Sequence, residues 1–380
     1  MAVTREILAE RVRAAITAAG RTQLSLALEI GLDHTALSKA LNGTRNFKSL
    51  EVALIAEHLG ISMEDLLSES DASTPAPAMA ARAQPDVSPA LREALERSDR
   101  LLELHRLLTD LGFGWAETTL DLPEFVGPPH RQGADLADRL RREAGLGDED
   151  LPYQLSDLSE LLEKRLGLDV GFEPLPTGLD GLSLSSGGLG LALVSSGIAA
   201  TRQRFTLAHE LGHLAAGDSQ RLTVDEDVFG RRSPDEIRAN AFAAAFLMPE
   251  GAIREAVPHG VTEEIIVDLL SRFGVSLDAL AFRLHNVGVV DAAGRDRIRS
   301  LSSSRIALRA GRARDLQARN DRRVPGNLLS RGIEAYVQGS ISVRPLADLL
   351  KVDPRDLLDE LTPPARSPIP PEEDPLEYSL

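Results

Sequence analysis

Two histidines and a glutamate stand inside an otherwise apolar segment, and this segment constrains the fold most strongly. The motif is His209-Glu210-Leu211-Gly212-His213, preceded by Phe205-Thr206-Leu207-Ala208. Residues four apart share one face of a helix, so a helix directs both imidazoles to one point. With such apolar flanks the helix is mostly buried, and buried ionisable side chains are costly unless something pairs with them. The pattern therefore predicts a buried helix whose polar face holds a cation.

The HExxH spacing on a helix is typical of a zinc site. The chain has no cysteine, which excludes disulfides, thiolate catalysis and cysteine-ligated metals. We therefore predict that His209 and His213 bind Zn²⁺ and that Glu210, beside the metal, takes a proton from bound water as a general base. The alternative, a chance HExxH on a surface helix, leaves the apolar flanks without a reason.

A catalytic zinc ion needs a third protein ligand. No third histidine follows at close range, because Asp218 stands near the place where HExxHxxGxxH has its last histidine. We favour Glu236, since Ser233 and Pro234 are typical of a helix start and place Glu236 in the first turn of a segment rich in small residues. Asn240, one turn on, is expected to donate a hydrogen bond to a ligating residue. The acidic candidates compared were Asp225, Glu226, Asp227, Asp235 and Glu236.

The other six histidines are assigned to the surface or to packing, with His259 and His285 the weak candidates for joining the site. They are His34, His58, His105, His130, His259 and His285.

Apolar spacing predicts helices over most of the chain and one short β region. Before the HExxH helix, three brief apolar runs separated by Gly and Ser predict a small antiparallel meander. These runs are Leu168–Phe172, Gly181–Leu184 and Gly190–Val194. After it, helices are expected from Ser233 to Met248, over about 262–286 and over about 325–361, with a polar, arginine-rich stretch between the last two.

The N-terminal segment RTQLSLALEIGLDHTALSKALNGTRNFKSLEVALIAEHLGISMEDLL resembles the Cro/cI-type (XRE) helix-turn-helix. Ala27 lets two helices approach closely and Gly31 supplies the tight turn between them. The small core is expected to contain Leu24, Leu28, Leu37 and Leu41.

This helix-turn-helix implies DNA binding, and its charge agrees. Residues 1–50 carry seven basic and four acidic side chains, a local charge of about +3 in a chain of net charge -16. The recognition helix should begin near Asp33. Base contacts are expected from His34, Thr35, Ser38 and Lys39, and phosphate contacts from Gln23, Arg45 and Lys48. The alternative is that this fold is a protein-interaction module.

The central segments RQRFTLAHELGHLAAGD and PDEIRANAFAAAFLMP closely resemble the ImmA/IrrE family of metallopeptidases, and the resemblance extends over most of 135–360. It implies that His209, His213 and Glu236 are the zinc ligands and Glu210 the general base, and Asn240 falls on the Asn of the family motif. One departure is Arg238, where many members have a second Glu; we expect it to affect only the rim of the site.

The expected fold class is mainly α with a small β-sheet (α+β) in the peptidase domain, preceded by a separate all-α five-helix domain. The expected divisions are a helix-turn-helix domain over 1–68, a linker over 69–90, the peptidase domain with a helical lead-in over 91–290, a helical, helix-turn-helix-like C-terminal region over 291–361 and a disordered tail over 362–380.

The resemblance implies a zinc-dependent endopeptidase that cleaves a helix-turn-helix repressor and so derepresses stress-response or mobile-element genes. The alternatives are a transcriptional regulator whose peptidase domain senses or binds without proteolysis, and an antitoxin-like partner. The expected partners are a protein substrate and operator DNA, with no membrane, and a homodimer is compatible with the sequence. No apolar run approaches the roughly 20 residues of a membrane span and the start does not resemble a signal peptide, so we expect a cytoplasmic protein.

Overall fold

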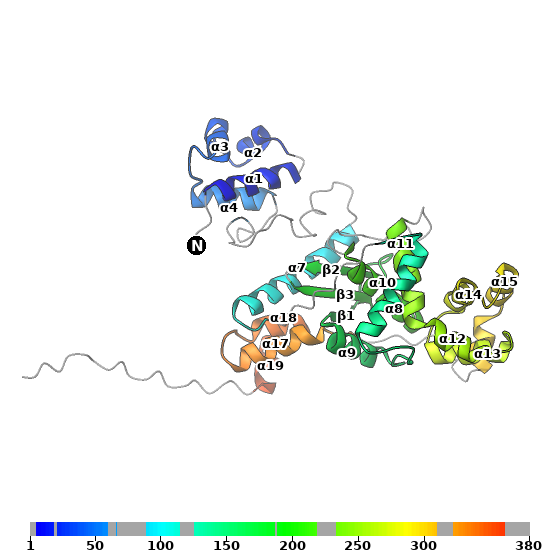
Figure 1. The fold of residues 1–380 in the computed structure, drawn as a ribbon. Coiled ribbons are helices and arrows are strands. Elements are labelled where there is room, and N and C mark those ends of the chain that lie inside the picture. The colour runs from blue at the N-terminus through cyan, green and yellow to red at the C-terminus, as the bar shows by residue number, and fades with distance from the viewer. Residues whose placement is uncertain are drawn as a thin grey trace, which may run out of the picture.

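A computed structural model describes residues 5–18, 21–59, 66, 89–114, 125–186, 188–218, 233–309 and 322–361 (Figure 1). The expected linker, up to Pro89 where α7 begins, and the expected tail lie outside these ranges. Within them, no helix is both long and apolar enough to cross a membrane.

Four N-terminal helices enclose a hydrophobic core of their own. They are α1 (Arg5–Ala18), α2 (Gln23–Glu29), α3 (His34–Leu41) and α4 (Ser49–Leu59). Of the expected fifth helix only Leu66 lies within the described residues, and its side chain is buried in the same core. Gly31 has a φ of 68°, which agrees with the tight turn expected between α2 and α3.

The expected core of this unit was half wrong. Leu37 and Leu41 are buried, but Leu24 is 54% exposed and Leu28 74% exposed. The helix α2 buries Leu26 and Ala27 instead, and Leu24 and Leu28 lie about 200° around the helix from Leu26. Both stripes of α2 have apolar residues at helical spacing, so the spacing alone did not select the buried one.

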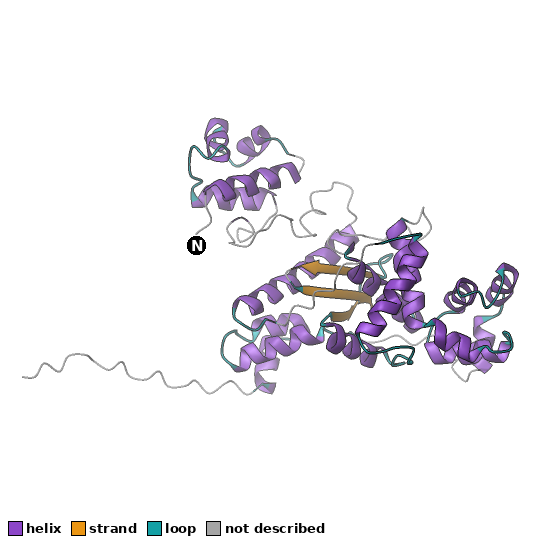
Figure 2. Ribbon diagram, in the orientation of Figure 1, coloured by secondary structure: helices purple, strands orange, loops and turns teal. Residues whose placement is uncertain are grey.

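The rest of the described chain combines many helices with one three-stranded sheet (Figure 2). Before the HExxH helix come α7 (Pro89–Asp110), α8 (Pro129–Glu143), α9 (Leu155–Leu166), β1 (Asp169–Glu173), β2 (Gly181–Ser186) and β3 (Leu189–Ser195). The HExxH helix and its successors are α10 (Ala200–Ala216), α11 (Pro234–Leu247), α12 (Glu250–Ala256), α13 (Glu263–Phe273) and α14 (Leu277–Asn286). The C-terminal elements are α15 (Ala292–Arg299), α16 (Ser303–Arg309), α17 (Gly326–Val337), α18 (Arg344–Leu350) and α19 (Pro354–Glu360). Helices α15 and α16 thus lie in the arginine-rich part of the C-terminal region, 291–361, which was expected to be helical.

The sheet is mixed, so the expected antiparallel meander is wrong. Its strand order is β1-β3-β2, with β1 parallel to β3 and β2 antiparallel to β3. After β1 the chain first forms β2, which does not pair with β1. It then forms β3, which lies between β1 and β2. Apolar alternation indicates strands but specifies neither their order nor their direction. At the outer edge of β1, Phe172 forms one antiparallel bridge with Arg323.

Each face of the sheet contributes to a different hydrophobic cluster, as the alternation of side chains along a strand requires. From β3, Ala192 and Val194 join the large core that contains α10 and α11. Leu191 and Leu193 face the other way and join leucines of α7, α17 and α18. In Figure 1, α7 and α17 accordingly lie on the opposite side of the strands from α8, α10 and α11.

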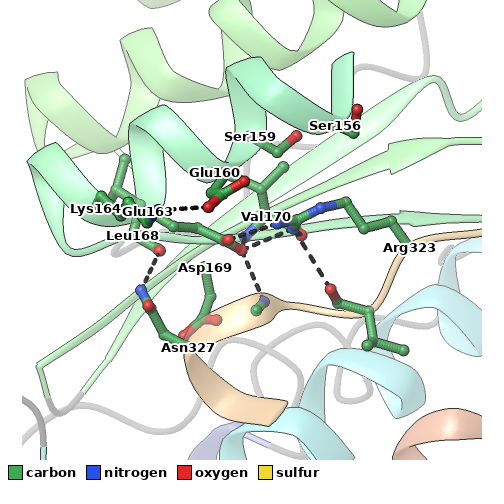
Figure 3. A network of polar contacts seen from close by, with 12 residues as sticks. Ser156, Ser159, Glu160, Glu163, Lys164, Leu168, Asp169, Val170, Arg323 and Asn327 are labelled. Carbon is green, nitrogen blue, oxygen red and sulfur yellow. Dashed lines mark hydrogen bonds and ion pairs between the residues drawn. The ribbon is translucent and has the colours of Figure 1, made fainter. Parts of the chain in front are cut away.

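A buried polar network attaches the C-terminal helices to the sheet (Figure 3). Glu163 of α9 forms an ion pair with Arg323 at 2.5 Å and accepts a hydrogen bond from the backbone N–H of Val170 at 3.1 Å. Asp169 of β1 accepts one from the backbone N–H of Leu328 in α17 at 3.0 Å. Both carboxylates are almost fully buried and both are satisfied, as buried charges must be. The C-terminal segment is therefore joined to the strands by polar contacts as well as by its leucines.

Candidate metal centre

Helix α10 presents its two histidines beside a close contact with α11. It ends at Gly217, which caps it with a φ of 76°. A Cβ added to Gly212 would lie 3.0 Å from the ring of Phe242 in α11. A glycine between the two histidines thus lets the helices approach closely enough for α11 to reach the polar face of α10.

Helix α11 begins as its sequence predicts. The Ser233 side chain accepts a hydrogen bond from the backbone N–H of Glu236 at 3.2 Å, and Pro234 occupies the first helical position. This start places Glu236 in the first turn, opposite His209 and His213 of α10. The competing candidates Asp225, Glu226 and Asp227 lie outside the described residues.

Three ligand atoms converge between the two helices. The Nε2 atoms of His209 and His213 are 3.1 Å apart, and they lie 3.3 and 3.2 Å from the carboxylate oxygens of Glu236. All three side chains are at most 12% exposed. Among the described residues, this is the one group of His, Asp and Glu with a metal-binding arrangement, and neither His259 nor His285 belongs to it.

The donor set fits a zinc ion. Bonds of about 2.0–2.1 Å in a tetrahedron place neighbouring ligand atoms about 3.3 Å apart, close to the separations observed here. Two ring nitrogens and a carboxylate also face one another at this point. A cation between them is the common partner that satisfies all three. A bound Zn²⁺ would be held by His209, His213 and Glu236, leaving a fourth position for water.

The electrostatics of the three groups agree with a cation site. Burial raises the pKa of Glu236, but hydrogen bonds from His209 and His213 outweigh it and hold the pKa well below its usual range. Burial disfavours the charged form of His213, yet hydrogen bonds to Asp218 and Glu236 raise its pKa to about 10. A surplus of negative charge therefore surrounds the two imidazoles.

Glu210 lies next to this cluster in a different environment. Burial raises its pKa, while His209, His213 and a hydrogen bond with Ser183 of β2 act in the opposite direction. A carboxylate with a raised pKa is suited to accept a proton and pass it on near neutral pH. Ser183 was not anticipated from the sequence, because nothing in the strand pattern says which serine faces the helix.

A pocket opens over this side of the cluster, with Glu210 and His209 in its wall. Arg202 and Asp180, which form an ion pair, also line it. Its lining residues are Gly178, Leu179, Asp180, Gly181, Arg202, Phe205, Thr206, His209, Glu210 and Asn240.

Asn240 and Arg238 lie one turn or less beyond Glu236, and only Arg238 differs from expectation. Asn240 donates the expected hydrogen bond to Glu236, at 2.9 Å, and the acceptor is the backbone carbonyl of that residue. Arg238 is not at the rim, because its side chain is only 8% exposed and forms an ion pair with Asp218. In the sequence, Asp218 was noted only because it stands near the place of a third histidine. In the structure its Oδ2 lies 3.3 Å from Nδ1 of His213.

The residues expected to bind DNA are distributed over the surface of the N-terminal unit. On α3, capped by Asp33, the side chains of His34, Thr35 and Lys39 are exposed and Ser38 is half-buried. Gln23 opens α2, and the Lys48 side chain is exposed. Arg45 differs, because its guanidinium donates to the carboxylate of Glu51 at 2.9 Å and to the carbonyl of Ala36. The Arg45 side chain is therefore half-buried and is held by partners within the domain.

Comparison with known proteins identifies two regions. Residues 163–285 match the IrrE N-terminal-like domain, which covers the central part of the expected 135–360, and residues 12–66 match a helix-turn-helix. The radiation response metalloprotease IrrE of Deinococcus radiodurans is 38% identical over 97 residues, 24% of this chain and 30% of that protein. The protein of the same name from Deinococcus deserti is 37% identical over 119 residues, 27% of this chain and 38% of that protein. The matches thus span about a third of these relatives.

Among solved structures, a Mycobacterium tuberculosis transcriptional regulator is 19% identical, covers 49% of this chain and 51% of its own, and has a TM-score of 0.30.

Proposed function

Because residues 163–285 carry an IrrE N-terminal-like metallopeptidase domain and residues 12–66 a helix-turn-helix domain, we propose that the chain is a zinc-dependent endopeptidase fused to a DNA-binding domain. One observation carries the proposal. The ligand atoms of His209, His213 and Glu236 converge within 4.8 Å of one another, and the buried carboxylate of Glu210 lies beside them in the wall of a pocket.

The residues of the chain divide the chemistry as follows. A bound zinc ion would act as a Lewis acid toward the substrate carbonyl and would lower the pKa of the water bound to it. Glu210 accepts the proton of the attacking water and passes it to the nitrogen of the departing amine. Ser183 fixes the carboxylate by a hydrogen bond, and burial raises the pKa of Glu210, which makes it a stronger base toward the proton of the water.

The sheet offers an extended peptide a place to bind. Strand β2 lies at the edge of the sheet, with β3 as its only strand partner among the described residues. It begins at Gly181, which also lines the pocket. An edge strand can add a peptide by backbone hydrogen bonds, which suits cleavage within an unfolded segment of a protein rather than removal of a terminal residue.

For the substrate we propose a helix-turn-helix repressor, whose cleavage would derepress stress-response or mobile-element genes. Two findings support this choice: the fused helix-turn-helix domain would hold the peptidase near operators, and the curated relatives are named as radiation response metalloproteases. We place the activity in the cytoplasm, where the DNA is.

The test uses the full-length protein with Zn²⁺ and a small repressor encoded beside it. Wild type should cut the repressor, and Glu210→Gln should bind zinc with unchanged stoichiometry but reduce cleavage by a factor of at least about 100. Glu160→Gln, an exposed glutamate of α9, is the matched control and should cut like wild type. Cleavage that persists in Glu210→Gln would refute the mechanism. Binding of promoter DNA by a zinc-loaded protein that cuts no repressor would instead favour a regulator without proteolysis.

A further inference from the structure

Asp218 occupies a position behind the proposed metal ligand His213. It directly follows Gly217, the C-cap of α10, so the glycine turn brings its side chain back toward the end of the helix. Its Oδ2 lies 3.3 Å from Nδ1 of His213, whereas Nε2 of the same ring lies 3.2 Å from Glu236. The two nitrogens of this imidazole therefore have different partners, one within the ligand cluster and one behind it.

Arg238 of α11 holds Asp218 from the other side. Its Nη2 lies 2.7 and 2.9 Å from the two oxygens of Asp218 and 2.7 Å from Asp235. Its guanidinium carbon lies 4.2 Å from the ring centre of Phe125, and its Nη1 lies 3.3 Å from the side-chain oxygen of Gln132. A buried arginine with this many partners is fixed in place, and so is the carboxylate it binds.

We propose that Asp218 and Arg238 act together as positioning residues for the metal ligand His213, an inference that rests on the metal centre of the proposed function. A neutral imidazole carries its proton on either nitrogen, and only the Nδ1–H tautomer leaves Nε2 able to bind a metal. A carboxylate that accepts from Nδ1 selects this tautomer, fixes the ring orientation and makes Nε2 more basic.

The arginine has a separate task within this arrangement. The centre already contains the carboxylates of Glu210 and Glu236, and a third one at Asp218 would repel them. Arg238 offsets this charge, because it places a guanidinium nitrogen 2.7 and 2.9 Å from the two oxygens of Asp218. It also occupies both Asp218 oxygens, so that this side chain stays behind His213.

The experiment measures the affinity of the full-length apoprotein for Zn²⁺ by competition with a chromophoric chelator. Asp218→Asn should weaken zinc binding about 10- to 100-fold, the usual effect of removing such a partner. Arg238→Met should weaken it by a smaller factor, and the double variant should bind no more weakly than Asp218→Asn alone, because Arg238 acts through Asp218. Asp235→Asn is the matched control: it removes an ion pair of the same arginine without touching His213 and should leave the affinity within about twofold of wild type.

The outcomes separate this inference from the proposed function. If wild type binds no zinc, the metal centre itself is wrong. If wild type binds zinc and Asp218→Asn binds it equally well, only the positioning role is refuted, and additive losses in the double variant would refute the coupling. The absorption spectrum of the Co²⁺-loaded protein provides a second readout, which Asp218→Asn should shift and Asp235→Asn should not. Should Asp218→Asn fail to fold, Arg238→Met must still lose more affinity than Asp235→Asn.

Discussion

Gly181 of β2 leaves the carboxylate of Glu210 just enough room: a Cβ on Gly181 would lie 2.9 Å from Oε1 of Glu210. It would also lie 2.6 Å from the side-chain methyl of Thr206, one turn earlier on α10. Ser183, two residues further along the strand, forms a hydrogen bond with the same carboxylate. Because alternate residues of a strand share a face, both positions belong to the surface of β2 that meets α10. The strand thus defines where the proposed general base can lie.

Gly181→Ala should therefore impair catalysis while zinc stays bound. The added methyl displaces Glu210, and a shift of about 1 Å in a catalytic group can lower the rate about 100-fold. We expect kcat for the repressor to fall at least about tenfold with unchanged zinc stoichiometry. Gly197→Ala is the control, since its added Cβ would come no closer than 3.5 Å to the nearest neighbouring atom. Equal kcat for the two variants would show that Glu210 does not depend on this contact.

Gly133→Ala should destabilise the whole domain. A Cβ at Gly133 of α8 would lie 2.1 Å from the carbonyl oxygen of Arg238 and 2.8 Å from the backbone nitrogen of Phe242 in α11. Backbone atoms cannot move aside as a flexible side chain can, so the helices must separate. Overpacking of this kind costs about 1–3 kcal/mol, measured as the loss of unfolding free energy in urea. Gly114→Ala, with 3.8 Å to its nearest neighbour, should cost less, and equal losses would contradict the close packing.

Asp169 should make stability depend on pH. Burial raises the pKa of its carboxyl to about 7, against about 3.9 for an unfolded chain. Between these values the folded protein binds more protons than the unfolded one, so this contribution is complete below about pH 4 and is lost as the pH rises through 7. Asp169→Asn removes the titration and can still accept from Leu328. Relative to wild type, its unfolding free energy should increase from pH 5 to pH 8.

The control for this measurement is Asp157→Asn, an exposed position on α9. Its difference from wild type should stay constant over the same interval. A constant difference for Asp169→Asn as well would mean that the buried carboxyl does not titrate there.

Substitutions of Lys48 and Arg45 should have different effects on the binding of duplex DNA from the region upstream of the gene. Lys48 is exposed, and if it contacts a phosphate, Lys48→Ala should lower the slope of log affinity against log salt by about 0.9, measured by fluorescence anisotropy. Arg45→Ala should mainly destabilise the domain, because it leaves the buried carboxylate of Glu51 without its ion-pair partner. Lys164→Ala, on α9, is the control, and a slope equal to the control's would remove Lys48 from the interface.

The sequence was most informative where a single helix determines the geometry. The spacing of His209 and His213 placed them on one face, and the capping residue Ser233 located the turn that carries Glu236. Asp218 and Arg238 could not be paired in this way, because they lie on either side of a long connection and meet only when α10 and α11 pack. An acidic residue just past the C-cap Gly217 was the available signal for Asp218.

The errors have a common physical origin. Apolar periodicity shows that a segment has a buried side, but the neighbouring elements decide which side it is. The two apolar stripes of α2 were therefore indistinguishable, and Leu24 and Leu28 were assigned to the wrong one. Apolar alternation identified the strands but not their order. The insertion of β3 between β1 and β2 depends on contacts between residues far apart in the sequence.

The most direct measurement is the anomalous scattering of a zinc-soaked crystal, recorded on both sides of the zinc absorption edge. We predict one strong peak within about 2.0–2.2 Å of Nε2 of His209, Nε2 of His213 and a carboxylate oxygen of Glu236. A peak elsewhere, or none between these three side chains in a crystal that contains zinc, would contradict the metal centre on which the proposed peptidase activity depends.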